Sequence, residues 1–91
     1  MNETGNERHN CAETVPAILE MEPKAARMAW MCWMADHDLS AGTELYASAK
    51  FVLMSIEMVI LNLGRDAEPW TRKRLAEQLA TFAELLRQWR G

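Results

Sequence analysis

The chain contains few of the residues from which covalent frameworks and rigid chemical sites are built. Its 91 residues include two cysteines, two histidines, four glycines and three prolines. Two cysteines cannot form a disulfide framework, and neither a glycine-rich phosphate loop nor a nucleophile elbow occurs. We therefore expect that the protein is not an enzyme and that it holds no cofactor.

The scarce cysteines and histidines also lack the spacing of a zinc motif. His9 and Cys11 lie in a polar segment, whereas Cys32 lies in an apolar run. The five-residue step from Cys32 to His37 places these two side chains on different faces of a helix. A small buried thiol is the simpler interpretation of Cys32, so we expect no metal.

Long hydrophobic runs are absent as well. The longest purely apolar run covers residues 28–35, far short of the roughly 18 residues that would suggest a membrane span. The first ten residues are polar and acidic, unlike a secretory signal, in which a basic stretch precedes an apolar one. We expect a cytoplasmic protein with no membrane partner.

Positive charge is in short supply, and its distribution is uneven. The net charge is −3, residues 1–44 carry eight acids and three bases, and residues 45–91 carry five acids and seven bases. General nucleic-acid binding usually needs a basic face, so the balance argues against a direct nucleic-acid partner.

A small DNA-binding regulator remains an alternative because the last part of the chain is locally basic. Such a protein would bind duplex DNA with a steep salt dependence. However, residues 75–89 keep an unbroken helical period, without the turn that a helix-turn-helix requires. The basic side chains in question are Arg72, Lys73, Arg74, Arg87 and Arg90.

The composition is not that of a disordered chain, since 49% of its residues are hydrophobic. Residues 1–12 show no helical period and are expected to form a flexible arm, and residues 13–91 are expected to form a single helical domain. A short helix capped by Thr14 comes first, and Pro23 suits the first turn of a second helix that reaches about His37.

The remaining residues predict two long helices. Ser40 with Glu44 suits the start of the third helix, which runs to Leu63, and Gly64 can take the left-handed conformation that closes it. Pro69 opens the fourth helix. Because all the predicted elements are helices, we predict an all-α fold, a small helical bundle. The link between the last two helices is short, so they should form a long C-terminal antiparallel hairpin.

The third helix carries two apolar stripes at steps of about 100° per residue, and two stripes need two neighbours. The core stripe comprises Leu45, Ala49, Val52, Ile56, Val59, Ile60 and Leu63. The outer stripe comprises Ala47, Phe51, Met54, Met58 and Leu61. The flanks between them carry Lys50 and Glu57 on one side, and Glu44, Ser48, Ser55 and Asn62 on the other. The fourth helix has a single stripe of Leu75, Leu79, Phe82, Leu86 and Trp89.

The second helix is apolar on every side between residues 28 and 35. A helix of this kind must be buried all round, yet in a thin bundle one of its faces has to meet something outside the subunit. We therefore expect partner binding by its large side chains and by the outer stripe. The expected partner-binding residues are Met28, Trp30, Met31, Trp33 and Met34, and the expected dimer or partner stripe is Phe51, Met54, Met58 and Leu61.

These features indicate a protein that acts by occupying an apolar surface of another protein. Methionine adapts its shape to a partner, and tryptophan contributes a large area with little entropy to lose. A homodimer, including a purely structural adaptor, would use the same residues, and both uses can coexist on different faces.

The pieces Ala47-Ser48, Ser55 and the run from Phe82 to Leu86, FAELL, occur within residues 45–89. On these pieces, residues 45–89 resemble the helical hairpin of small pseudomonad proteins, and the whole chain resembles the pseudomonad quorum-sensing antiactivators. The resemblance implies binding to a LuxR-type transcription factor and covering of the surface through which that regulator dimerises. Loss of the dimer would then prevent DNA binding.

From the sequence we expect Trp33→Ala or Met58→Glu to weaken association while most of the helicity remains. Circular dichroism would distinguish the roles of these residues. Global unfolding of a variant would place the residue in the core rather than in an interface.

Overall fold

The computed structural model describes residues 15–37, 39 and 43–90, apart from the side chains of residues 89 and 90. Within these ranges the fold is entirely helical, which confirms the predicted all-α bundle. The expected arm at residues 1–12, the caps Thr14 and Ser40, and the side chains of Trp89 and Arg90 lie outside the described parts.

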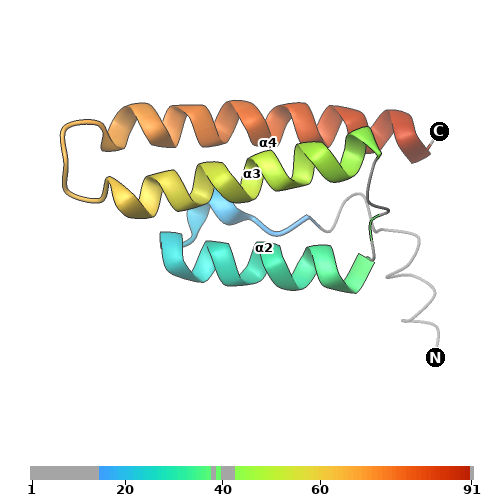
Figure 1. Ribbon diagram of the computed structural model, residues 1–91, viewed down its shortest axis with the longest axis horizontal. Helices are drawn as coiled ribbons and strands as arrows, with labels where there is room; N and C mark the ends of the chain where they lie inside the picture. Colours follow the sequence, from blue (N-terminus) through green and yellow to red (C-terminus); the bar gives the residue numbers. More distant parts are fainter. Residues whose placement is uncertain (1–14, 38, 40–42, 91) are drawn as a thin grey trace.

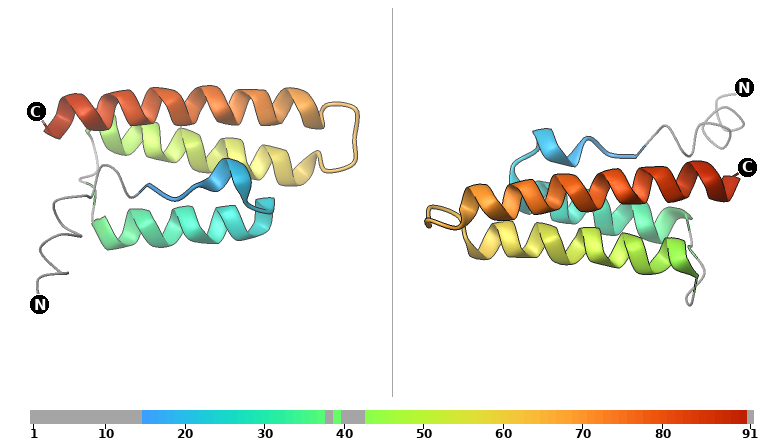
Figure 2. Two further views of the ribbon diagram at one scale, coloured as in Figure 1. Left: turned by 180° about the vertical axis from the view of Figure 1, so that it is seen from behind. Right: turned by 90° about the horizontal axis from the view of Figure 1, so that it is seen from above.

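A 3₁₀ turn and three α-helices follow one another along the chain. They are η1 (Ile18–Glu20), α2 (Pro23–His37), α3 (Glu44–Leu61) and α4 (Glu68–Arg90). α3 lies between α2 and α4, and the three helices run in alternating directions (Figure 1). η1 packs behind this layer, on the side away from the exposed face of α3 (Figure 2). The molecule is therefore thin, and one side of its central helix has no layer over it.

The ends of the helices follow local chemistry that the sequence only partly revealed. Pro23 opens α2 as predicted. α3 begins after Thr43, whose Oγ1 accepts a hydrogen bond from the backbone N–H of Tyr46 at 3.1 Å. α3 ends at Leu61, two residues earlier than expected, and Gly64 takes the predicted left-handed conformation with φ of 76°.

An aromatic cluster joins the three helices. Trp30 and Trp33 of α2 stack with ring centroids 5.3 Å apart, and each meets the edge of Phe82 of α4, at 5.1 and 5.5 Å. The indole N–H of Trp30 donates to the backbone oxygen of Ala49 in α3 at 2.9 Å. α2 is thereby fixed to both helices of the hairpin, by ring packing to one and by a buried hydrogen bond to the other.

The predicted core stripe of α3 forms one hydrophobic core with this cluster. Five of its members, together with Leu75, Phe82 and Leu86 of α4 and Ile18 of η1, are buried. Ile60 is only partly buried, and Leu63 is exposed because it follows the end of the helix. The buried members of the stripe are Leu45, Ala49, Val52, Ile56 and Val59.

The second helix differs from the expectation that its tryptophans face a partner. Trp30 and Trp33 are buried in the chain itself, Met34 is half-buried between α2 and α3, and Met28 and Met31 are exposed. The two indoles lie on one face at a spacing of three residues, and burying them removes more apolar area from water than burying the methionines. They must therefore be reassigned to the core.

Trp30 and Trp70 offer a matched pair of substitutions. Trp30→Phe removes the hydrogen bond to Ala49 and leaves a cavity in the core, so the free energy of unfolding should fall by about 2 kcal/mol. Trp70 is 63% exposed, so Trp70→Phe should change it by less than about 0.5 kcal/mol. Urea unfolding followed by circular dichroism measures both, and equal losses would contradict the assignment of Trp30.

The link between α3 and α4 is closed by one carboxylate. Glu68 accepts hydrogen bonds from the backbone N–H of Gly64 and from Nε of Arg72, both at 2.8 Å. These two donors stabilise the charged form, and they hold the pKa of Glu68 below its ordinary value, with the Gly64 N–H the larger cause.

The lowered pKa of Glu68 makes the stability of the fold depend on pH. A carboxyl with a lower pKa in the folded state stabilises above its ordinary pKa, and this contribution disappears as the pH falls through the lowered value. Glu68→Gln should therefore be less stable than the wild type at neutral pH, and the difference should vanish in acid. Thermal unfolding across this pH range, with an NMR titration of the Glu68 side chain, tests both points.

Candidate protein-docking surface

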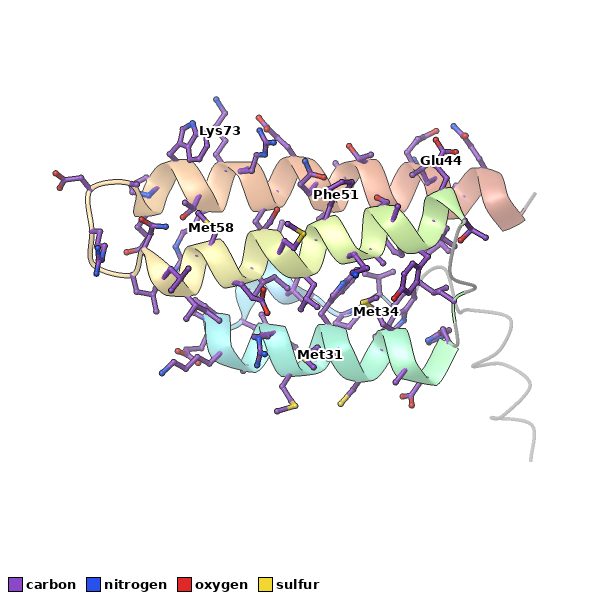
Figure 3. All side chains as sticks on the ribbon, viewed as in Figure 1. Met31, Met34, Glu44, Phe51, Met58 and Lys73 are labelled. Carbon is purple, nitrogen blue, oxygen red and sulfur yellow. The ribbon has the colours of Figure 1, made fainter. Side chains whose placement is uncertain are left out.

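An exposed apolar face lies on the side of α3 that no other helix covers. Four members of the predicted outer stripe contribute to it, and their exposed fractions range from 47% for Met58 to 66% for Leu61. Phe51 and Met58 lie on this side of α3, away from η1 (Figure 3). We call this surface the outer face, and it comprises Phe51, Met54, Met58, Leu61 and Trp70.

A groove runs between α3 and α4 within the outer face. It has a volume of about 330 Å³, near the lower end of the range of ligand sites. Its lining side chains span two turns of α3 and a little more of α4, so the groove follows the direction of the helices. The residues that line it are Phe51, Met54, Ser55, Met58, Trp70, Thr71, Arg74 and Gln78.

The two hydroxyl groups in this groove are already engaged. Oγ of Ser55 donates to the backbone oxygen of Phe51 at 2.9 Å, and Oγ1 of Thr71 donates to the backbone oxygen of Glu68 at 2.8 Å. Both residues are buried. Because each hydroxyl donates its proton to its own helix, neither residue has a donor left for an occupant, and the polar groups that the groove still offers are the side chains of Arg74 and Gln78.

A second hollow, of about 520 Å³, lies on the other flank of α3 and is shared with α2. Met28 and Leu61 both line it, so the apolar surface continues from the outer face onto the start of α2. An ion pair spans the two helices here, with Nε of Arg27 3.2 Å from Oε2 of Glu57. Glu57, on the predicted polar flank of α3, is thus paired with α2.

The structure therefore brings together only part of the predicted binding set. The four outer-stripe residues and Met28 are exposed and contiguous around Leu61. Met31 is exposed but points away from the bundle, on the far side of α2 (Figure 3). The remaining three, Trp30, Trp33 and Met34, belong to the core or pack against it.

Trp70 is a surface residue that the sequence reasoning missed. Its side chain lies in the first turn of α4 and lines the groove opposite Met58. At about 100° per residue it falls about 140° away from Leu75 on the helix, well off the buried stripe. The sequence did contain a signal for this surface position: a large aromatic residue outside the core stripe of an amphipathic helix.

The residues considered for metal binding show no common site. Cys32 is exposed, which corrects its interpretation as a buried thiol. The ring of His37 stacks on Trp33 at 4.4 Å, and its Nδ1 lies 2.9 Å from the backbone oxygen of Trp33. Among the described residues, no group of three or more histidine, cysteine or acidic side chains is arranged to hold a metal ion. His9 and Cys11 lie outside these residues.

The basic side chains considered for DNA binding are partly engaged by acids of their own helix. Nε of Arg72 binds Glu68, and Arg87 forms an ion pair with Glu84. Lys73 points outward from α4 (Figure 3), whereas Arg74 lines the groove. These arginines and Lys73 therefore do not form one continuous row of unpaired basic side chains.

Comparisons with protein-family models, curated proteins and solved structures found no match to this chain. No helix in the described part of the chain is both long and apolar enough to cross a bilayer.

Proposed function

We propose that the protein is a regulator that binds another protein and acts by covering an apolar surface of it. The outer face carries this proposal. Its five large side chains lie side by side, at least 47% of each remains in contact with water, and the core beneath them is already filled. Contiguous exposed apolar patches of more than a few hundred Å² are typical of interaction sites.

The composition of the outer face favours recognition. Two methionines lie between Phe51 and Trp70, and a flexible thioether beside rigid rings suits a surface that must fit a preformed partner. The engaged hydroxyls of Ser55 and Thr71 leave the groove without an evident nucleophile or acid. Occupation of a surface, without chemistry, is the function that this arrangement supports.

In its finer form the proposal names a LuxR-type transcription factor as the partner. Two arguments support it. Residues 45–89, which carry the outer face, resemble the helical hairpin of small pseudomonad proteins, and the whole chain resembles the quorum-sensing antiactivators. A protein that displaces an apolar dimer interface must also offer apolar area of its own. The regulator would be left unable to dimerise and to bind its DNA site.

A second candidate function is that of a homodimeric adaptor, because the outer face of one copy can cover that of another. The exposed apolar area alone favours this use as much as binding to a different protein. The two functions differ in what the purified chain does by itself, since only the adaptor buries the outer face without a partner.

The test compares two substitutions of exposed methionines. Met58→Glu places a charge in the outer face, and Met31→Glu places the same charge on the far side of α2. A purified LuxR-type regulator and its DNA site provide a gel-shift assay. We expect the wild type and Met31→Glu to abolish the shift, and Met58→Glu to be at least about tenfold weaker, since an unpaired charge in an apolar interface costs more than 1 kcal/mol.

Sizing of the chain alone completes the experiment. A stable dimer that Met58→Glu dissociates, together with no effect on the regulator, would establish the adaptor and exclude the antiactivator. Loss of activity in Met31→Glu but not in Met58→Glu would move the binding surface to α2. Circular dichroism of both variants checks that each remains folded.

A further inference from the structure

The outer face is bordered by a positive charge on each side. Arg74 lines the groove on the α4 side. Lys50 lies on the opposite flank of α3, which it shares with Glu57, and the ion pair of Glu57 with Arg27 shows that this flank is turned toward α2. Both Lys50 and Arg74 are exposed. A protein of net charge −3 thus presents an apolar surface with two cationic edges.

The nearby acids do not neutralise these two edges. Glu57 is engaged by Arg27, and Glu68 is engaged by Arg72 and the backbone of Gly64. Among the described residues, neither Lys50 nor Arg74 has a carboxylate within ion-pair distance. Nζ of Lys50 lies 5.8 Å from the ring centroid of Tyr46, a contact that leaves its charge available.

From this arrangement we infer the kind of segment that the outer face binds: an amphipathic helix with an apolar stripe and acidic residues on both flanks. The inference rests on the proposed function and specifies its partner. The groove runs parallel to α3 and α4, so it can receive a row of side chains spaced three and four residues apart. The acidic flanks of such a helix would then face Arg74 on one side and Lys50 on the other.

The same charges disfavour a second copy of the chain as the occupant. Arg74 lies beside the middle of the outer face, among the side chains of the groove. Consider a two-fold dimer whose axis passes through the middle of the outer face. If the axis lies across the helices, Arg74 faces Arg74 of the second copy. If the axis runs along the helices, Arg74 faces the flank of the second copy that carries Lys50. Both arrangements bring like charges together, which opposes association.

The probes are two synthetic helical peptides of about 18 residues, long enough to form a stable amphipathic helix with helix-favouring side chains. They share one stripe of leucine and tryptophan, and they differ only in whether glutamate or lysine occupies both flanks. Fluorescence anisotropy of the labelled peptides with the full chain gives the affinities. We expect the glutamate peptide to bind roughly tenfold more tightly at low salt, with a smaller ratio at high salt.

Charge reversals on the protein identify the source of the preference. Arg74→Glu and Lys50→Glu should each reduce the ratio severalfold, because each removes an attraction and adds a repulsion. Lys73→Glu changes the net charge equally but lies on the outward side of α4, so it should preserve the ratio. A ratio that all three variants change alike would show a general charge effect and overturn the inference.

Three further outcomes separate this inference from the proposed function. Equal binding of both peptides, abolished by Met58→Glu, would overturn the acidic-helix partner while supporting the outer face as a docking surface. Binding of neither peptide would also overturn it, and the gel-shift assay would then decide the proposed function independently. Self-association of the chain that excludes the glutamate peptide would assign the face to a second copy instead.

Discussion

The fold depends on the way Trp30 bridges the three helices. Its indole N–H donates to the Ala49 carbonyl of α3, and its ring stacks on Trp33 and meets the edge of Phe82. A ring of this size can be removed from water in so small a protein only if it spans several elements, and a buried indole N–H needs an acceptor. The bridge satisfies both needs and fixes the side of α3 that faces inward. The opposite side of α3 is then left without a layer of its own chain.

This geometry explains why an apolar face remains in water. α3 is the most hydrophobic of the helices, and its two stripes would both be buried in a larger protein. Here α2, α4 and η1 all pack around the core stripe, and the described chain has no further helix to place over Phe51, Met54 and Met58. Small domains bury a lower fraction of their surface. The outer face thus follows from the composition of α3 and from the packing of α2, α4 and η1 around its core stripe.

Periodicity predicted the hairpin well, because α3 and α4 have polar sides that define their faces, and Gly64 marked the link between them. It failed on α2, where residues 28–35 are apolar all round and no face is distinguished by polarity. The 4-3-4 spacing of Ala26, Trp30, Trp33 and His37 did contain the answer, since ring size decides which side is buried. The position of Trp70 beside Met58 could not be derived, since it depends on the register between two helices.

In the proposed complex, affinity and specificity would come from different groups of the outer face. Apolar contacts with Phe51, Met58 and Trp70 are non-directional, so alone they would accept many partners, including a second copy. Rim charges contribute little net energy in water, but they act over several ångströms and penalise a partner of the wrong sign. Because Glu57 and Glu68 are engaged by Arg27 and Arg72, and no described carboxylate forms an ion pair with Arg74 or Lys50, these two charges are not cancelled. Under the proposed function, the intramolecular ion pairs would therefore help to define which partner the apolar surface can hold.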